Sequence, residues 1–207
     1  MAMGKLVPAP ADLAPCSDLA LATRTLAAFQ PRDAEQARTQ EQMLDFIRRH
    51  PRDAHRRSCL EGHLTASVLL WNATRSKVLL HHHRKLQRWL QFGGHCDGDA
   101  NLLGCAWREL REESGIEPEW ISPAPVDLDI HTIPARAGEP RHLHYDVRFL
   151  ARAGPQALPA RSQESLELRW ISPGEVEVLA LDGSLRRLLD LEAYGREESP
   201  PGIALGV

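Results

Sequence analysis

Residues 94–116 read GHCDGDANLLGCAWRELREESGI, a segment dominated by three closely spaced carboxylates. Glu109, Glu112 and Glu113 share one face of a helix, because successive residues are separated by about 100°. On the same helical wheel, Glu113 falls inside the apolar stripe that begins at Leu102, so we expect it to point inward. Carboxylates this close repel one another, and one that points inward needs a cation. Oxygen ligands on a rigid helix suit Mg²⁺ or Mn²⁺, and the alternative is a solvated acidic face.

The residues around this helix favour the metal site. A strand-like run at residues 89–92 leads into a glycine-containing loop, and a helical pattern starts at Leu102. Asp99 or Asn101 is placed to cap the start of the helix, and Gly115 is placed to end it in a left-handed conformation. The sequence therefore predicts a strand, a loop and a helix with its acids in the last turns.

This segment resembles the box of the Nudix hydrolase family, which reads Gly, five residues, Glu, seven residues and Arg-Glu-apolar-x-Glu-Glu-x-Gly-apolar. The positions that match are Gly94, Arg108, Glu109, Leu110, Glu112, Glu113, Gly115 and Ile116. The resemblance implies an α/β/α sandwich with a mixed β-sheet over roughly residues 61–193. It also implies divalent-metal ligation by Glu109, Glu112 and Glu113, with Gly94, Arg108 and Gly115 supporting the loop and the helix.

One position of the box departs from the family pattern. Ala100 stands where the family has its first Glu. This replacement affects the outer part of the metal site and the tie between the loop and the helix. Asp97 and Asp99 are the candidates to substitute for the missing carboxylate, a hypothesis that replacing each by Ala tests through the Mg²⁺ dependence of activity.

The expected chemistry follows from the metal. Carboxylate-bound Mg²⁺ retains water and takes further ligands from substrate phosphates, so hydrolysis of a phosphoanhydride is expected. The resemblance implies a small nucleoside diphosphate derivative as the substrate. Catalytic roles are predicted for Glu109, Glu113 and Glu164, and the base is either Glu109 or Glu164. Glu164 precedes a late strand, where the family often supplies another Glu; the opposite interpretation is a solvent-exposed loop acid.

Two further polar groups are candidates for substrate binding. Residues 142–149 read HLHYDVRF, so His142, His144 and Asp146 share one face of a strand. This face is an ordinary polar surface, a substrate contact or a second site for a transition metal. Arg84 belongs to a basic stretch before the box, which either attracts phosphates or forms a solvated turn.

Composition narrows the classes of partner. The 207 residues carry a formal net charge of −3, which provides no overall attraction to nucleic acid or to an anionic membrane. No run of about 18 apolar residues and no secretory signal pattern is present, so we expect a cytoplasmic protein. The four cysteines form no C-x-x-C pair, which favours reduced thiols.

The rest of the chain predicts one catalytic domain with an N-terminal helical extension. Residues 1–60 form the extension, of which about the first 15 are expected to be flexible; residues 61–195 form the Nudix domain and residues 196–207 a tail. Helical patterns occupy residues 17–50 and 185–193. Strands are predicted at residues 63–71, 77–82, 89–92, 126–133, 142–151 and 167–171.

Two functional classes remain open. The first is an active, metal-dependent hydrolase of a nucleotide derivative, which the intact second half of the box supports. The second is a catalytically weak Nudix fold used for nucleotide sensing or partner binding, suggested by Ala100 and by the extension. The extension either packs on the domain, forms a homodimer or covers the substrate.

Overall fold

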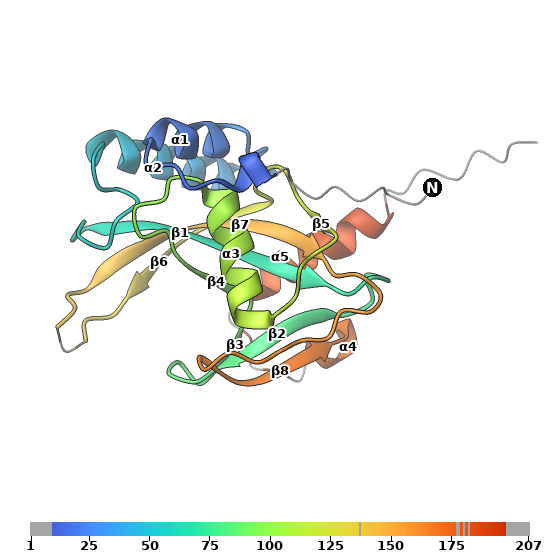
Figure 1. Cartoon of the computed structure of the whole chain (residues 1–207). Coiled ribbons are helices and arrows are strands. Elements are labelled where there is room, and N and C mark those ends of the chain that lie inside the picture. The colour runs from blue at the N-terminus through green and yellow to red at the C-terminus, as the bar shows by residue number, and fades with distance from the viewer. Residues whose placement is uncertain (1–9, 137, 177–178, 180, 182, 198–207) are drawn as a thin grey trace, which may run out of the picture.

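A mixed β-sheet of eight strands forms the centre of the part of the chain that the structure describes (Figure 1). This structure is a computed structural model, and it describes residues 10–136, 138–176, 179, 181 and 183–197. The strands are β1 (Gly62–Trp71), β2 (Val78–His83), β3 (Arg88–Leu90), β4 (Phe92–His95), β5 (Trp120–Ile121), β6 (Asp127–Ile133), β7 (His142–Arg152) and β8 (Ser165–Ile171).

The central strands β1 and β7 run parallel, and the other pairings are antiparallel. The main path through the sheet is β3-β2-β1-β7-β5, while β4 pairs with β1, β6 with β7 and β8 with β2. Parallel neighbouring strands need a long connection between them. Between β1 and β7 this connection contains α3 (Leu102–Ser114) and the short strands around it.

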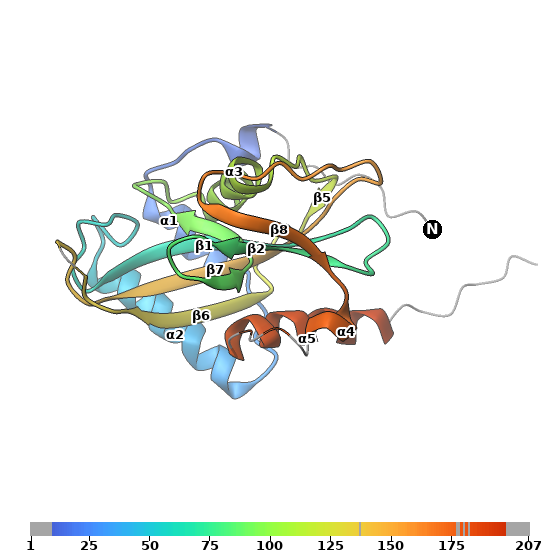
Figure 2. The same ribbon diagram turned by 90° about the horizontal axis from the view of Figure 1, so that it is seen from below.

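The helices form the outer layers. They are η1 (Pro10–Leu13), α1 (Leu19–Ala27), α2 (Ala34–Arg49), α3 (Leu102–Ser114), α4 (Pro173–Val176) and α5 (Gly183–Glu197). Helix α3 crosses one face of the sheet and α5 lies against the other, as Figure 2 shows. This arrangement confirms the predicted α/β/α sandwich with a mixed sheet. Within the described part of the chain, no helix is both long and apolar enough to cross a membrane.

Strand β1 is buried along its whole length because both of its faces are covered. Its even-numbered residues, such as Leu64 and Val68, pack in the main core with α1, α2 and α3. On the opposite face, Leu69 and Trp71 pack with α5 in a second core. The beginning of that same face is polar and starts with His63, which is also buried.

The N-terminal helices are part of the main core. Leu26, Met43 and Phe46 are fully buried, and Phe46 stacks on Tyr145 of β7 with ring centroids 3.9 Å apart. The Gln36 amide exchanges two hydrogen bonds of 3.0 Å with the backbone of Leu128 in β6. These bonds occupy backbone groups of β6 that a neighbouring strand does not pair. The extension therefore packs on the domain through both core contacts and backbone bonding.

Most predicted elements are found with small shifts at their ends. The strand predicted at residues 89–92 is divided into β3 and β4, which pair with different neighbours. Strand β5, η1 and α4 were not predicted, because two to four residues carry no measurable periodicity. The flexible start predicted for the chain lies largely in residues 1–9, outside the described residues, and residues 10–13 form η1. Of the predicted tail, residues 198–207 also lie outside them.

Candidate active site on the acidic helix

Helix α3 is capped at both ends by the residues around it. The Asn101 side chain accepts a hydrogen bond of 3.0 Å from the backbone N–H of Gly104, so Asn101 is the N-cap. Gly115 ends the helix with φ of 69°, as predicted. Asp99 accepts bonds from the N–H groups of Asn101 and Cys16 instead. These caps set where α3 begins and ends.

The three glutamates of α3 differ in exposure. Glu113 is buried with 6% of its surface exposed, the Glu109 side chain is 18% exposed, and Glu112 faces solvent. The backbone N–H of Gly93 donates a hydrogen bond of 2.9 Å to Glu113 Oε2. The predicted inward direction of Glu113 is therefore confirmed. Of the three glutamates, only Glu112 lies on a solvent-exposed face.

Gly94 and Arg108 hold Glu109 in place. A Cβ atom on Gly94 would lie 2.6 Å from Glu109 Oε2, so a larger residue there would displace this carboxylate. Arg108 Nη2 donates to Glu109 Oε1 at 3.0 Å and to the carbonyl of His95 at 3.1 Å. Arg108 thereby joins the loop to the helix through these two hydrogen bonds, and its supporting role in the site stays a prediction.

The electrostatics of this site favour a bound cation. Burial raises the pKa of Glu113 to about 8, and the charges of Glu109, Glu164 and Glu112 add to the shift. Burial also raises the pKa of Glu109, which the Arg108 guanidinium partly opposes. His81 Nδ1 lies 4.0 Å from Glu113 Oε1, but burial lowers the pKa of His81 to about 4, so this ring is neutral at pH 7. A divalent cation would compensate the carboxylates that these groups leave unbalanced.

The carboxylate oxygens nevertheless do not converge on one point. Among the described residues, sets of three ligand atoms within 4.8 Å of one another occur only in two groups that contain histidine, and the glutamates of α3 are not among them. Like charges on one helix face keep their carboxylates apart when no cation draws them together. The backbone positions and the donor chemistry fit a divalent ion, while the ligand roles of Glu109, Glu112 and Glu113 stay a prediction.

Glu164 lies in the loop before β8, close to the acidic helix. Its side chain is 66% exposed and 4.0 Å from His83 Nε2. Burial is the largest cause of the raised pKa values of Glu109 and Glu113. The negative charge of Glu164 raises both values further. The same loop is tied to the end of α3, because Ala160 N–H donates to the Ser114 carbonyl at 2.7 Å. The tertiary structure therefore brings Glu164 towards the cluster.

An open cleft of about 510 Å³ is lined by Arg84, Arg161, Ser162 and Gln163. The last of these residues directly precedes Glu164 in the sequence. Arg84 Nε donates a hydrogen bond of 3.0 Å to the Gln163 carbonyl. The two arginines supply the local positive charge that a phosphate substrate requires. Arg161 was not identified from the sequence, because a single arginine in a loop forms no recognisable pattern.

The polar face of β7 lies on the side of the sheet away from α3. Gly94 faces α3, so the next residue of β4, His95, points to the opposite side with His144. Asp146 is buried and accepts hydrogen bonds from Thr65, Ser67 and Arg148 at 2.8–3.0 Å. His142 and His144 are thus not brought together with the glutamates, and their substrate contacts remain a prediction.

Residues 12–16 of the extension cover the start of α3 and explain the departure at Ala100. Ala100 is fully buried and its N–H donates to the Cys16 carbonyl at 2.5 Å. A Cβ atom on Gly104 would lie 2.8 Å from the Leu13 carbonyl oxygen. Small residues are required here because the extension passes directly over them. No sequence pattern predicts the contact between residues 12–16 and the start of α3, because the two segments are far apart in the chain.

The two candidate substitutes for the missing Glu have different surroundings. Asp97 forms a bidentate pair with Arg57 at 2.6 and 2.7 Å. Asp99 Oδ2 lies 3.9 Å from Arg108 Nη1. Asp99 is therefore the carboxylate placed to tie the loop to the helix.

The cysteines form no disulfide bonds. All four cysteines of the chain are free, as predicted. Contact with Cys105 and burial raise the pKa of Cys96 well above its usual value. The Cys96 thiol therefore stays protonated and serves as a packing residue.

Comparison with known proteins agrees with this fold and box. The family model described as NUDIX domain matches residues 62–191. The fold is similar to a C. elegans Ap4A hydrolase in a binary complex, with 16% identity, 65% of this chain and 97% of that chain covered, and a TM-score of 0.52. No curated protein matches the sequence.

Two other solved structures show the same fold. The NUDIX domain of Shewanella oneidensis NrtR complexed with ADP ribose is 20% identical, with 64% of this chain and 87% of that chain covered and a TM-score of 0.50. The E. coli dihydroneopterin triphosphate pyrophosphohydrolase is 16% identical, with 65% and 95% covered and a TM-score of 0.50. Because the family match spans the box, the central sheet and α3, the chain belongs to the Nudix family.

Proposed function

We propose that this protein hydrolyses a phosphoanhydride bond in a small nucleoside diphosphate derivative with the help of a divalent metal ion. The observation that carries the proposal is the burial of the Glu113 carboxyl beside Glu109 on the Nudix helix, where it accepts a hydrogen bond from the Gly93 N–H. Nudix hydrolases generally need a divalent metal ion, and a buried acid with acidic neighbours is what a cation would stabilise.

Each glutamate has a role that fits its surroundings. Glu109, Glu112 and Glu113 would hold Mg²⁺, or alternatively Mn²⁺, which polarises the phosphate and lowers the pKa of bound water. Gly93 N–H and the Arg108 guanidinium keep the carboxylates of Glu113 and Glu109 in position. Such positioning contributes to the rate because the groups need not reorganise during the reaction.

A small nucleotide derivative is the substrate class that the charges favour. Arg84 and Arg161 line the cleft beside Glu164 and would hold a phosphate group. The net charge of −3 does not favour a nucleic-acid polymer. The structural neighbours are named for Ap4A, ADP ribose and dihydroneopterin triphosphate, so these three compounds belong in the first substrate panel.

The central experiment is a screen of nucleoside diphosphate derivatives with Mg²⁺ or Mn²⁺ that follows the release of phosphate-bearing products. The Glu112→Gln plus Glu113→Gln variant should lose at least about 100-fold in kcat, because it removes charge at the metal site. Glu117→Gln is the matched control, since this exposed glutamate pairs with Arg111 at the end of α3. Turnover that survives the double substitution would disprove the assignment of the metal ligands.

The general base is tested separately. Glu164→Gln should lower kcat by about 100-fold with little change in KM if Glu164 takes the proton from water. Glu167→Gln is the control, because Glu167 is a half-exposed acid of β8 that pairs with Arg169. An unchanged kcat in Glu164→Gln would exclude this role and leave Glu109 as the base.

Nucleotide sensing is the alternative function. The burial of Ala100 beneath the extension is the observation that favours it, since the first Glu of the family box has no counterpart there. Tight nucleotide binding by calorimetry without turnover of any member of the panel would support sensing over hydrolysis.

A further inference from the structure

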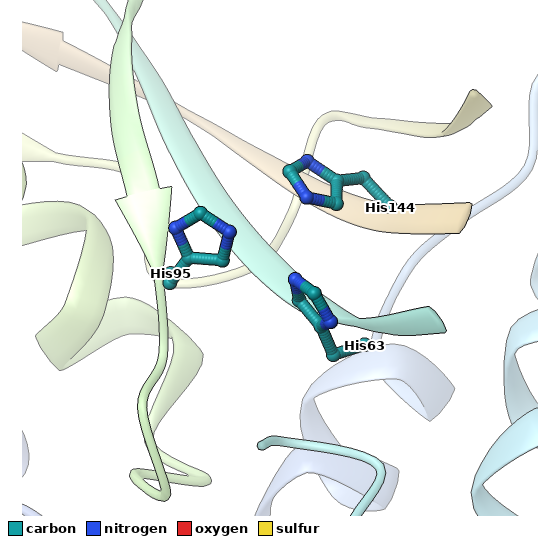
Figure 3. Close-up of side chains that lie close together, drawn as sticks. All are labelled: His63, His95 and His144. Carbon is teal, nitrogen blue, oxygen red and sulfur yellow. The ribbon is translucent and has the colours of Figure 1, made fainter. Parts of the chain in front are cut away.

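Three histidine side chains meet on the face of the sheet that α3 does not cover. His63 comes from β1, His95 from the end of β4 and His144 from β7. Figure 3 shows their rings turned towards one another from these three strands. The ring centroids are 4.8–5.0 Å apart, and one nitrogen from each ring lies within 4.8 Å of the others. The tertiary structure thus gathers three potential ligands from distant segments.

Four of the six nitrogens of these rings are buried without a hydrogen-bond partner among the described residues. His63 is 3% exposed, and neither of its ring nitrogens has a hydrogen-bond partner among the described residues. The same is true of the buried Nε2 atoms of His95 and His144. Buried polar side-chain atoms are nearly always hydrogen-bonded, so three open rings at one point indicate a missing ligand.

The protonation state of the rings suits metal binding. Burial lowers the pKa of His63 to about 4, and the neighbouring histidines add to this effect. Burial likewise lowers the pKa values of His95 and His144. All three imidazoles are therefore neutral at pH 7 and offer a nitrogen lone pair, which is the form that coordinates metals.

We propose that His63, His95 and His144 bind one Zn²⁺ ion and leave a fourth coordination position open. Zn–N bonds of about 2.0–2.1 Å in tetrahedral geometry would place the ring centroids about 5 Å apart. This spacing agrees with the 4.8–5.0 Å between the rings. Imidazole nitrogens favour Zn²⁺ over the hard ions that suit the glutamates of α3.

A second group of three possible ligands does not carry the same inference. His50, Asp53 and Cys59 also lie close together. There, however, His50 Nε2 is 2.9 Å from Glu61 Oε2 and its Nδ1 is 3.3 Å from Cys59 Sγ. Burial raises the pKa of Cys59, which keeps the thiol protonated. Hydrogen bonds within the protein therefore explain this group without a metal.

The zinc site is separate from the acidic site but connected to it through β4. His95 follows Gly94 in β4, and Gly94 lies against Glu109 on the α3 side of the sheet. The carbonyl of His95 accepts a hydrogen bond from Arg108, the residue that holds Glu109. An ion bound to His95 would fix the end of β4 from the opposite face of the sheet, where the loop leading to α3 begins.

The first test measures bound zinc in the full chain carrying Glu112→Gln and Glu113→Gln, so that the acidic site is disabled. After loading with Zn²⁺ and dialysis, mass spectrometry of the metal should find about one equivalent per chain. Adding His63→Gln and His144→Gln should remove it. His131→Gln should retain it, because His131 lies beside His144 but binds Asp129 through Nδ1. Circular dichroism verifies that each variant is folded.

A second measurement requires no histidine substitution. Co²⁺ added to the same glutamate variant should produce the intense visible absorption of a four-coordinate ion, and Zn²⁺ should displace it. The proposal is overturned if the variant retains no Zn²⁺, if it retains zinc without His63 and His144, or if Co²⁺ shows only the weak absorption of a six-coordinate ion. None of these outcomes depends on hydrolase activity, so they leave the proposed function to its own test.

Discussion

Glu113 is a carboxyl group placed where a charge is destabilising. Burial raises its pKa to about 8, although the Gly93 N–H stabilises the charged form. The folded protein without metal therefore holds this proton more tightly than the unfolded chain, whose Glu pKa is 4.5. This property links stability to pH, because folding is favoured wherever the native state binds the additional proton.

The sign of this effect can be measured. The contribution of Glu113 is fully present below pH 4.5 and is lost as pH rises to about 8. In EDTA, wild-type protein should lose a few kcal/mol of unfolding free energy relative to Glu113→Gln between pH 5 and pH 8. Urea unfolding at both pH values tests this, with the exposed Glu117→Gln as the control. An equal difference between wild type and Glu113→Gln at both pH values would contradict it.

Ala100 is a small residue because the N-terminal segment passes over it. Its N–H bonds to the Cys16 carbonyl, and its side chain is fully buried. Restoring the Glu of the family box should therefore destabilise this chain, since a longer, charged side chain would enter a packed site.

We expect Ala100→Glu to lower the free energy of unfolding by about 2–5 kcal/mol. Ala135→Glu is the control at an exposed loop position and should change stability by less than about 0.5 kcal/mol. Thermal and urea unfolding provide the measurement. If Ala100→Glu were as stable as wild type, the extension would not occupy the place of the missing side chain.

The end of α3 shows how one element positions another. Gly115 adopts φ of 69°, and a Cβ atom there would lie 2.7 Å from the Cβ of Ala160. The loop that begins near Ala160 carries Glu164 and the cleft arginine Arg161. The glycine therefore serves two purposes, because it ends the helix and allows this loop to pack against it.

Gly115→Ala should cost about 2–3 kcal/mol of unfolding free energy, through left-handed strain and the overlap with Ala160. Gly138→Ala is the matched control, since φ there is 83° and no atom lies within 4 Å of the added Cβ. The control should cost only about 1 kcal/mol. Equal losses in the two variants by urea unfolding would show that the contact with Ala160 is unimportant.

At the scale of the whole molecule, two cores lie on either side of the sheet. The main core joins α1 and α2 of the extension to β1, β7 and α3, and the second core joins the sheet to α5. Phe46 of α2 is fully buried and stacks on Tyr145. The packing of the Nudix domain therefore includes residues that precede it in the sequence.

Phe46→Ala should lower the free energy of unfolding by about 3–5 kcal/mol, because it removes a large side chain from the shared core. Leu60→Ala is the control, since Leu60 is 71% exposed, and it should have an effect below about 0.5 kcal/mol. A small effect of Phe46→Ala in urea unfolding would mean that the extension and the domain are energetically independent.

The part of the fold that could be predicted is the part encoded by local patterns. Helix α3 with Asn101 and Gly115 at its ends follows from caps and apolar spacing within a few residues. The long strand β1 likewise follows from its largely apolar run, and β7 from its alternation of polar and apolar residues. Strand β5 could not be predicted, because its two residues gain their bonds from β7, far along the chain.

The sequence by itself determined the acidic helix, the direction of Glu113 and the family to which the chain belongs, since all three depend on the spacing of neighbouring residues. Only the tertiary structure decided that residues 12–16 lie over Ala100 and that Glu164 lies beside the acidic cluster. It also decided that His63, His95 and His144 meet on the opposite face of the sheet. The physical reason is that such contacts depend on how strands pair and which faces are covered. Periodicity along one segment carries no information about the segment that will pack against it.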